Sequence, residues 1–370
     1  MKELKGIYTS AKIMTDDVED YAKAQIQMIC DQEAVRKSKI RVMPDVHPGK
    51  VGPIGLTMTI GEKLIPQLLG IDIGCGVICV RLKEKRMEYQ KLEKVIRDRI
   101  PAGFAIRENA HYLAEDFDFT KLHCHKHVQE EKDRLALGSL GGGNHFIEVD
   151  QGEDKALYLV IHSGSRRLGK EVAEYYTREG EKELKQKGQE VPYPLTWITG
   201  SLLEDYLHDV QVVQAYAKLN REIMIQEILK GMKLKAEETI MSVHNYLDCS
   251  GEVPLLRKGA VSAKKGETVI IPVNMRDGVI LGTGLGNSEW NQSAPHGSGR
   301  KYRRDEVKNH YTVSTFKKAM KGIYSESIRA ETLDEAPFAY RSLDEIKDTI
   351  SETVKIREVI RPVYSFKSGI

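Results

Sequence analysis

Five separated stretches of the chain place histidine or cysteine beside glycine or asparagine. They are residues 70–76, 141–145, 162–166, 244–245 and 296–300. Aspartate, cysteine and histidine are ligands of transition metals, and glycine lets the backbone come close to a metal ion or a phosphate. The combination predicts a metal-dependent enzyme that acts on phosphates.

The first four stretches carry the residues with metal-ligand chemistry. Asp72 and Cys75 lie close together among glycines, and His145, His162 and His244 each adjoin an apolar, strand-like segment. A thiolate binds soft or borderline metals and can bridge two of them, whereas a carboxylate suits harder ions such as manganese. Each residue alone is equally compatible with a glycine-rich turn or a buried core histidine, but their recurrence at strand ends predicts one metal centre.

The fifth stretch, His-Gly-Ser-Gly-Arg, begins at His296 and runs into the basic segment 300–304. Its glycines leave backbone donors free for phosphate, and Arg300 can bind phosphate through two hydrogen bonds. His296 is a candidate nucleophile toward phosphorus, although a glycine-rich surface turn is equally compatible with the motif. His47, beside Pro48 and Gly49, could touch a substrate phosphate or orient a ligand, or could simply lie in a turn.

Two other segments resemble sites but are not assigned to one. Residues 123–127, His-Cys-His-Lys-His, contain the densest ligand residues, but their neighbours are charged and helix-like, which favours an exposed or structural role. Residues 282–287 are glycine-rich but lack the Gly-Lys-Ser/Thr ending of a P-loop, which disfavours a P-loop nucleotidase.

Strand-like and helix-like segments alternate around these motifs. Helical patterns cover residues 15–32, much of 82–131, 170–235 and 343–358; strand patterns cover 40–80, 139–149, 156–161 and 240–285; residues 361–367 form a tail. We predict an α+β fold in which residues 1–370 form a single mixed domain of β-sheets, with residues 170–235 as a helical insertion. The motifs then lie at strand ends and in loops.

Composition is that of an ordinary globular protein. The 370 residues carry a net charge of +2, so only local basic clusters such as 300–304 and 257–258 argue for contacts with a phosphate backbone. The five cysteines are scattered, which does not fit a disulfide framework. The sequence contains neither a signal-peptide pattern nor a membrane-span pattern, so we expect a cytoplasmic protein without a membrane partner.

Taken together, the motifs resemble those of the RtcB family of RNA ligases over essentially the whole chain. The resemblance is carried by residues 43–47, 70–76, 141–148, 162–166, 244–245, 257–260 and 296–300. It implies an RtcB-like fold and a GTP- and manganese-dependent ligase. Such an enzyme joins RNA 3′-phosphate or 2′,3′-cyclic phosphate ends to 5′-hydroxyl ends, in RNA repair or tRNA splicing. An activating protein partner is not identified by the sequence.

The resemblance also implies roles for individual residues. His296 becomes guanylated, and two manganese ions are held by Asp72 and His145 on one side and His162 and His244 on the other, with Cys75 as the bridge. The residues expected to contact the guanylate, its base or phosphates are Asn144, Glu148, Asn245, Arg300, Tyr340 and Lys367, with Arg166 and His47 on substrate phosphate.

The sequence differs from the family pattern at three places. Residues 272–278 replace the common Pro-Gly-Ser-Met-Gly, Ser298 replaces an alanine, and Arg303-Arg304 replace a serine-arginine pair. The chain is also short for the family, which is compatible with a divergent RNA-repair branch. Two alternatives are a metal-dependent phosphoesterase that opens RNA cyclic phosphates without ligation, and an RNA-end-binding protein without activity. Zinc also suits the Cys/His ligand set.

Overall fold

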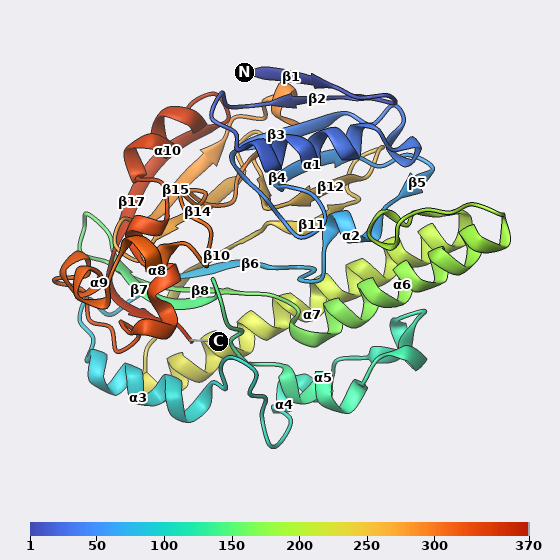
Figure 1. Ribbon diagram of the computed structural model, residues 1–370. Coiled ribbons are helices and arrows are strands. Elements are labelled where there is room, and N and C mark those ends of the chain that lie inside the picture. Colours follow the sequence, from blue (N-terminus) through green and yellow to red (C-terminus); the bar gives the residue numbers. More distant parts are fainter. Residues whose placement is uncertain (369–370) are drawn as a thin grey trace.

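The computed structural model describes residues 1–368 and contains two large β-sheets flanked by helices (Figure 1). The six-stranded sheet has the order β1 (Lys2–Lys5), β2 (Ser10–Ile13), β3 (Ile40–His47), β4 (Ile54–Thr59), β12 (Leu255–Lys258) and β11 (Asn245–Asp248). The seven-stranded sheet has the order β10 (Ala236–Val243), β6 (Gly76–Leu82), β8 (Leu157–Ser163), β7 (Phe146–Gln151), β17 (Val354–Phe366), β15 (Gly278–Gly284) and β14 (Thr268–Asn274). Two small sheets pair β13 (Ala260–Ser262) with β16 (Ser293–Pro295), and β5 (Lys63–Leu64) with β9 (Ile198–Thr199).

The helices lie around these sheets rather than in a separate layer. They are α1 (Asp20–Cys30), α2 (Pro66–Leu69), α3 (Tyr89–Arg99), α4 (Tyr112–Glu115), α5 (Glu130–Ala136), α6 (Arg166–Gln186), α7 (Gly200–Met232), α8 (Val307–His310), α9 (Val313–Ala319) and α10 (Leu343–Ile350). The predicted α+β class is confirmed. In residues 1–368 no helix has the length and apolar character needed to cross a membrane.

Helix α7 is the longest element and joins the two main cores. Val210, Val213 and Tyr216 in its first half pack into the core that contains the inner residues of β3 and β4. Met224 and Ile228 in its second half pack into the core against β6 and β8, to which α3 also contributes. The segment predicted as a helical insertion therefore supplies a helix that supports both sheets (Figure 1).

The first predicted helix is shorter than expected. It was expected to cover residues 15–32, but α1 begins only at Asp20, after Glu19 in an extended conformation. The Thr15 hydroxyl accepts a hydrogen bond from the backbone N–H of Asp17, so it closes a local turn instead of capping the helix.

The C-terminal prediction was wrong in its second half. The helix expected over residues 343–358 ends at Ile350, and the expected tail is part of β17, which lies between β7 and β15. Residues 354–357 alternate between apolar and charged side chains, which favours a strand. Pro362, which cannot donate to a ladder, lies at a register shift in the pairing with β7.

Candidate active site

Four strand ends meet at one edge of the seven-stranded sheet. In the ladder, Gly76 at the start of β6 pairs with Ser163 on one side and Val243 on the other, and Phe146 at the start of β7 pairs with His162. Cys75, His145 and His244 lie one residue beyond these strand ends. The register alone therefore gathers ligand residues that are widely separated in the sequence.

The gathered side chains form two groups that share Cys75. Cys75 Sγ lies 3.4 Å from His145 Nε2 and 3.2 Å from His162 Nε2. His162 Nε2 lies 3.1 Å from His244 Nε2, and His145 Nε2 lies 3.1 Å from Asp72 Oδ2. One group is Cys75 with His162 and His244, the other Cys75 with Asp72 and His145, and within each group all ligand atoms lie within 4.8 Å of one another.

The protonation states suit metal binding. His162 Nδ1 lies 3.1 Å from the carbonyl of Asn144, which can only accept, so the ring proton is on Nδ1 and Nε2 keeps its lone pair. Burial lowers the pKa of His162 and His244 well below the usual range, so both rings are neutral. Burial alone would raise the pKa of Asp72, but the hydrogen bond with His145 holds it at about 2. A carboxylate, a thiol and three imidazoles that face one another are a ligand set that would hold divalent ions.

Glycine is required where two loops of the centre approach each other. A Cβ on Gly164 would lie 1.9 Å from Asp72 Oδ1, and a Cβ on Gly141 would lie 2.2 Å from His145 Nδ1. Both distances are far inside van der Waals contact. The glycines of the motifs thus let the backbone touch the ligand side chains.

Two consecutive residues of α7 tie these loops together. Buried Arg221 donates from Nη1 to the carbonyls of Gly74, at 2.8 Å, and of Ser163, at 2.7 Å. Asn220 accepts from the backbone N–H of Gly138 and donates to the carbonyl of Gly164. The side chains of Asn220 and Arg221 therefore fix the loops on which the ligands lie.

His296 lies beside this centre and is oriented by a buried carboxylate. Its ring centroid lies 5.0 Å from that of His244. Asp45 Oδ2 accepts from His296 Nδ1 at 2.6 Å and from the His296 backbone N–H at 3.2 Å. With the proton on Nδ1, the Nε2 lone pair is available as a nucleophile. His47 lies on the same side, with its ring 6.4 Å from that of His296, and burial lowers the pKa of His47 to about 4, which keeps it neutral.

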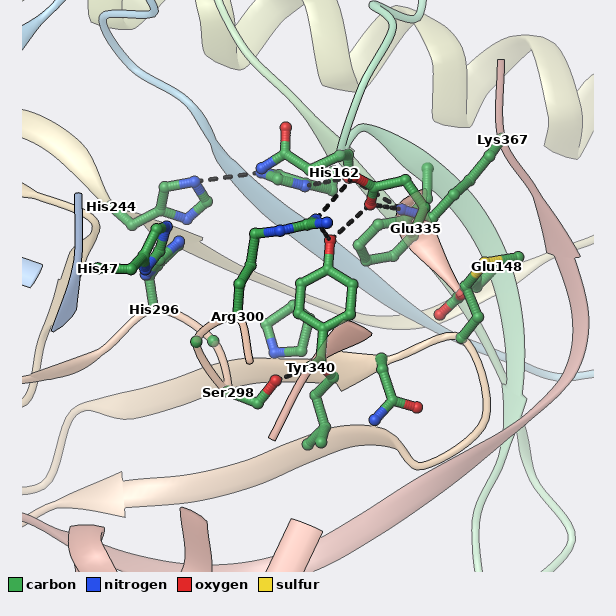
Figure 2. Close-up of a pocket in the computed structure, with 18 of the residues that line it drawn as sticks. His47, Glu148, His162, His244, His296, Ser298, Arg300, Glu335, Tyr340 and Lys367 are labelled. Atoms are coloured by element: carbon green, nitrogen blue, oxygen red, sulfur yellow. Dashed lines mark hydrogen bonds and ion pairs between the residues drawn. The ribbon is translucent and has the colours of Figure 1, made fainter. Parts of the chain in front are cut away.

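A pocket opens from His296 toward the C-terminal strand (Figure 2). Its far wall is organised by Glu335, which is 2% exposed and accepts from Lys367 Nζ at 2.8 Å and from the Tyr340 hydroxyl at 2.6 Å. Arg300 and Arg304 also form ion pairs with Glu335. Arg304 also pairs with Asp334, so three cations face two carboxylates, and the single positive charge in excess favours an anionic ligand.

Glu148 and Asn144 line the same pocket. The Ser365 hydroxyl donates to Glu148 Oε1 at 2.8 Å, and burial raises the pKa of Glu148 to about 7. The divergent segment 272–278 contributes Val273, Asn274 and Met275 to the wall, and the Ser298 hydroxyl donates to the Val273 carbonyl at 2.7 Å.

Three predicted contact residues are placed differently from the others. Arg166 lies across the metal centre from the pocket, where Nε donates to the Ser139 hydroxyl and Nη2 to the Gly103 carbonyl. Asn245 accepts from the Gly259 N–H and donates to the Asp72 carbonyl, so its amide braces the ligand loop. Arg300 lines the pocket, but its guanidinium contacts Glu335 and the carbonyls of Asp334 and Tyr302. Their phosphate contacts stay predictions.

Sequence reasoning missed several residues that shape the site. Asp45 lies in the segment 43–47 that carries the resemblance but was given no role, and Glu335, Asn220 and Arg221 were not singled out. Lys258 is 5% exposed, burial lowers its pKa to about 8, and among residues 1–368 its side-chain amine has no hydrogen-bond or ion-pair partner. In the sequence, Lys258 appears only as one member of the basic pair Arg257-Lys258. That pair was interpreted as solvated or facing phosphate, so the burial of Lys258 was not predicted.

Fold and site together define an α+β protein with a cysteine-bridged pair of ligand groups beside a carboxylate-oriented histidine. A family model described as tRNA-splicing ligase RtcB matches residues 25–368. The chain is 29% identical to the RNA-splicing ligase RtcB of Escherichia coli K12, over 89% of this chain and 90% of that protein. It is 24% identical to the tRNA-splicing ligase RtcB of Nanoarchaeum equitans, over 98% of this chain and 94% of that protein. The chain belongs to the RtcB family.

Proposed function

We propose that this protein is a GTP- and manganese-dependent RNA ligase. It joins RNA ends bearing a 3′-phosphate or 2′,3′-cyclic phosphate to 5′-hydroxyl ends through a guanylate on His296, in RNA repair or tRNA splicing. The observation that carries the proposal is the position of His296. Its ring lies between the metal-ligand groups and a buried, positively charged pocket, and Asp45 leaves its Nε2 free to react.

The first step is nucleotide transfer to the histidine. Nε2 of His296 attacks the α-phosphorus of GTP, a P–N bond forms, the P–O bond to the β-phosphate breaks, and pyrophosphate leaves. The proton on Nδ1 stays in the hydrogen bond with Asp45, which stabilises the positive charge that develops on the ring. Because its pKa is low, His47 is a neutral imidazole, so it places no positive charge beside the ring of His296.

Guanine is recognised at the far end of the pocket. An ionised Glu148 accepts hydrogen bonds from the two adjacent N–H groups on the Watson–Crick edge of guanine, which adenine does not present in that arrangement. Lys367, held by Glu335, donates to the base, and Asn144 and Tyr340 line the intervening space. Guanine is preferred because adenine would leave these buried polar groups unpaired.

The metal centre lies on the other side of His296. Asp72, Cys75, His145, His162 and His244 would hold two manganese ions, which when bound neutralise phosphate charge and align the reacting groups. Asn220 and Arg221 keep the ligand loops in place.

Sealing then consumes the guanylate. An oxygen of the RNA 3′-phosphate attacks the guanylate phosphorus and the P–N bond breaks, which returns His296 and leaves an activated RNA end. The 5′-hydroxyl of the second RNA attacks the activated 3′-phosphate and gives up its proton to solvent, a phosphodiester forms, and GMP leaves with the electron pair of the broken P–O bond. A cyclic phosphate first takes up water to become a 3′-phosphate.

The direct test is guanylation followed by sealing. Manganese-loaded protein incubated with α-labelled GTP should acquire an acid-labile label that His296→Ala abolishes and His310→Ala, an exposed histidine, retains. Labelled protein should then convert 3′-phosphate and 5′-hydroxyl fragments into one product. Cyclic-phosphate opening without GTP, label or sealed product would instead identify a phosphoesterase and overturn the proposal. RNA binding without label or product would also refute it.

A further inference from the structure

A third group of ligand side chains lies far from the active site. His123 lies between the short helical turns η2 (Phe119–Lys121) and η3 (His125–His127), and His208 and Asp209 are adjacent residues of α7. Their ligand atoms all lie within 4.8 Å of one another, and the two imidazole rings meet edge to face with centroids 4.7 Å apart. The sequence alone favours an exposed or structural role for the segment 123–127, but in the structure His123 of this segment lies beside His208 and Asp209 of α7.

We propose that His123, His208 and Asp209 form a separate binding site for zinc or a similar borderline divalent cation. Two imidazoles and one carboxylate are donors that such ions accept, with water in the open position. In a tetrahedral zinc site with bonds of about 2.0–2.1 Å, ligand atoms lie roughly 3.4 Å apart. The observed group must therefore contract by little more than about 1 Å, and both histidines are exposed and have room to turn.

The hydrogen bonds around the group provide an independent argument. His208 Nε2 lies 2.9 Å from the carbonyl of Lys121, so the ring donates its proton there and Nδ1 retains a lone pair. A ligand histidine that donates its other N–H to a backbone carbonyl is the common arrangement at metal sites. The same arrangement fixes His162 in the active site.

The carboxylate is also held from behind. Asp209 is fully buried; Oδ1 accepts from the His123 N–H at 2.8 Å, and Oδ2 accepts from the Cys124 N–H at 3.1 Å and the Tyr176 hydroxyl at 2.7 Å. Each oxygen has more than one lone pair, so these bonds orient the carboxylate without exhausting it. Asp205, whose Oδ1 lies 3.6 Å from His123 Nδ1, adds a second negative charge beside the group.

A bound ion would connect the loop at residues 119–128 to α7. The site lies twelve residues before Arg221 on the same helix, which corresponds to roughly 18 Å at 1.5 Å per residue. That distance separates it from the reacting groups. The ion is therefore a structural clamp on the helix that carries Asn220 and Arg221, and it takes no part in catalysis.

The test counts zinc ions in the untagged, full-length protein. The metal-stripped chain is equilibrated with zinc chloride, freed of excess by gel filtration, and analysed by mass spectrometry for zinc per chain. His208→Ala should retain one zinc fewer than the wild type, His123→Ala should agree with it, and the control His125→Ala should retain the wild-type number. Zinc should also raise the melting temperature of Cys75→Ala, which lacks the ligand shared by the two active-site groups, by more than it raises that of the Cys75→Ala/His208→Ala double variant.

The outcomes do not depend on ligase activity. Equal zinc content in the wild type, His208→Ala and His123→Ala would overturn the proposal, as would equal zinc-induced melting shifts in the single and double variants. His208→Ala should guanylate at the wild-type rate. The zinc count therefore tests this site and the guanylation rate tests the proposed ligase function, so that one can fail without the other.

Discussion

Asp45 gives the sharpest test of how His296 is prepared for reaction. Asp45 is fully buried, and Oδ2 accepts from His296 Nδ1 at 2.6 Å, a length typical of a charge-assisted hydrogen bond. In Asp45→Asn the side chain keeps its shape but loses its charge, and its NH₂ group can face the ring. The imidazole is then free to carry its proton on Nε2, the atom that attacks phosphorus in the proposed reaction.

The expected loss is large because both the tautomer and the developing charge depend on this carboxylate. Replacing the carboxylate that orients a catalytic histidine by an amide lowers turnover about 10⁴-fold in serine proteases. We therefore expect guanylation of Asp45→Asn to slow by roughly 10³–10⁴-fold, which corresponds to about 4–5 kcal/mol in activation free energy. GTP affinity should change little, because Asp45 does not line the pocket.

Single-turnover transfer of label from α-labelled GTP measures this effect directly. Asp150→Asn is the matched control: Asp150 is also fully buried, and burial raises its pKa well above the usual range, so it is already neutral and resembles an amide. The control should guanylate within about threefold of the wild type. A folded Asp45→Asn variant that loses less than tenfold would refute the assignment of Asp45 as the residue that sets the tautomer.

Three further predictions follow from buried ionisable groups. Burial raises the pKa of the Cys75 thiol well above its usual range, so binding of manganese must release a proton, and calorimetry between pH 6.5 and 8.5 should show affinity rising with pH; a pH-independent affinity would contradict this. Because the pKa of Glu148 is about 7, GTP affinity should weaken below pH 7 and level off above it, whereas Glu148→Gln should show a weak, flat profile in the same titration. Burial lowers the pKa of Lys258 from 10.5 to about 8, so Lys258→Met should stabilise the fold at pH 7 by up to about 3 kcal/mol in denaturant unfolding. That gain should shrink as pH rises from about 8 toward 10.5, since the wild-type ammonium loses its proton there, and a gain that grows with pH would exclude a desolvated lysine.

The convergence of the candidate metal ligands could be predicted because its members share a local signature. Each lies within two residues of glycine or asparagine, and all but Asp72 lie at or next to the end of a strand. Strand ends that are paired in register must meet at one edge. The sequence could not supply the pairing partners themselves. Only the ladder shows that Gly76 faces both Ser163 and Val243, which is what brings Cys75 to the shared position between two ligand groups.

The residues that were missed depend on contacts across long sequence separations. Glu335 is a single acidic residue in an irregular segment, and nothing near it in the sequence indicates that Lys367, Arg300 and Arg304 converge on it. Arg221 looks like one more charge on a long helix, although it is fully buried against two loop carbonyls. Local patterns identify ligands, but the groups that orient them are set by packing.

Two of the departures from the family pattern are in direct contact, which makes them one feature. The hydroxyl of Ser298, where related ligases commonly carry alanine, donates to the carbonyl of Val273 at the start of the divergent loop. Both residues are buried, and Val273 lies at the register shift between β14 and β15, where the ladder leaves its carbonyl in need of another donor. The Ser298 hydroxyl supplies that donor, so the serine and the loop form one hydrogen-bonded unit.

Ser298→Ala tests this coupling. The substitution leaves a buried carbonyl unpaired, which costs about 1–3 kcal/mol of folding free energy, whereas the exposed control Ser351→Ala should cost less than about 0.5 kcal/mol. Because Val273 also lines the nucleotide pocket, the same change should raise the GTP concentration needed for half-maximal guanylation while leaving the maximal rate nearly constant. Denaturant unfolding and a GTP titration of the labelling rate measure the two effects. A variant as stable as the control would mean that the loop holds its position without Ser298, and that the two departures arose independently.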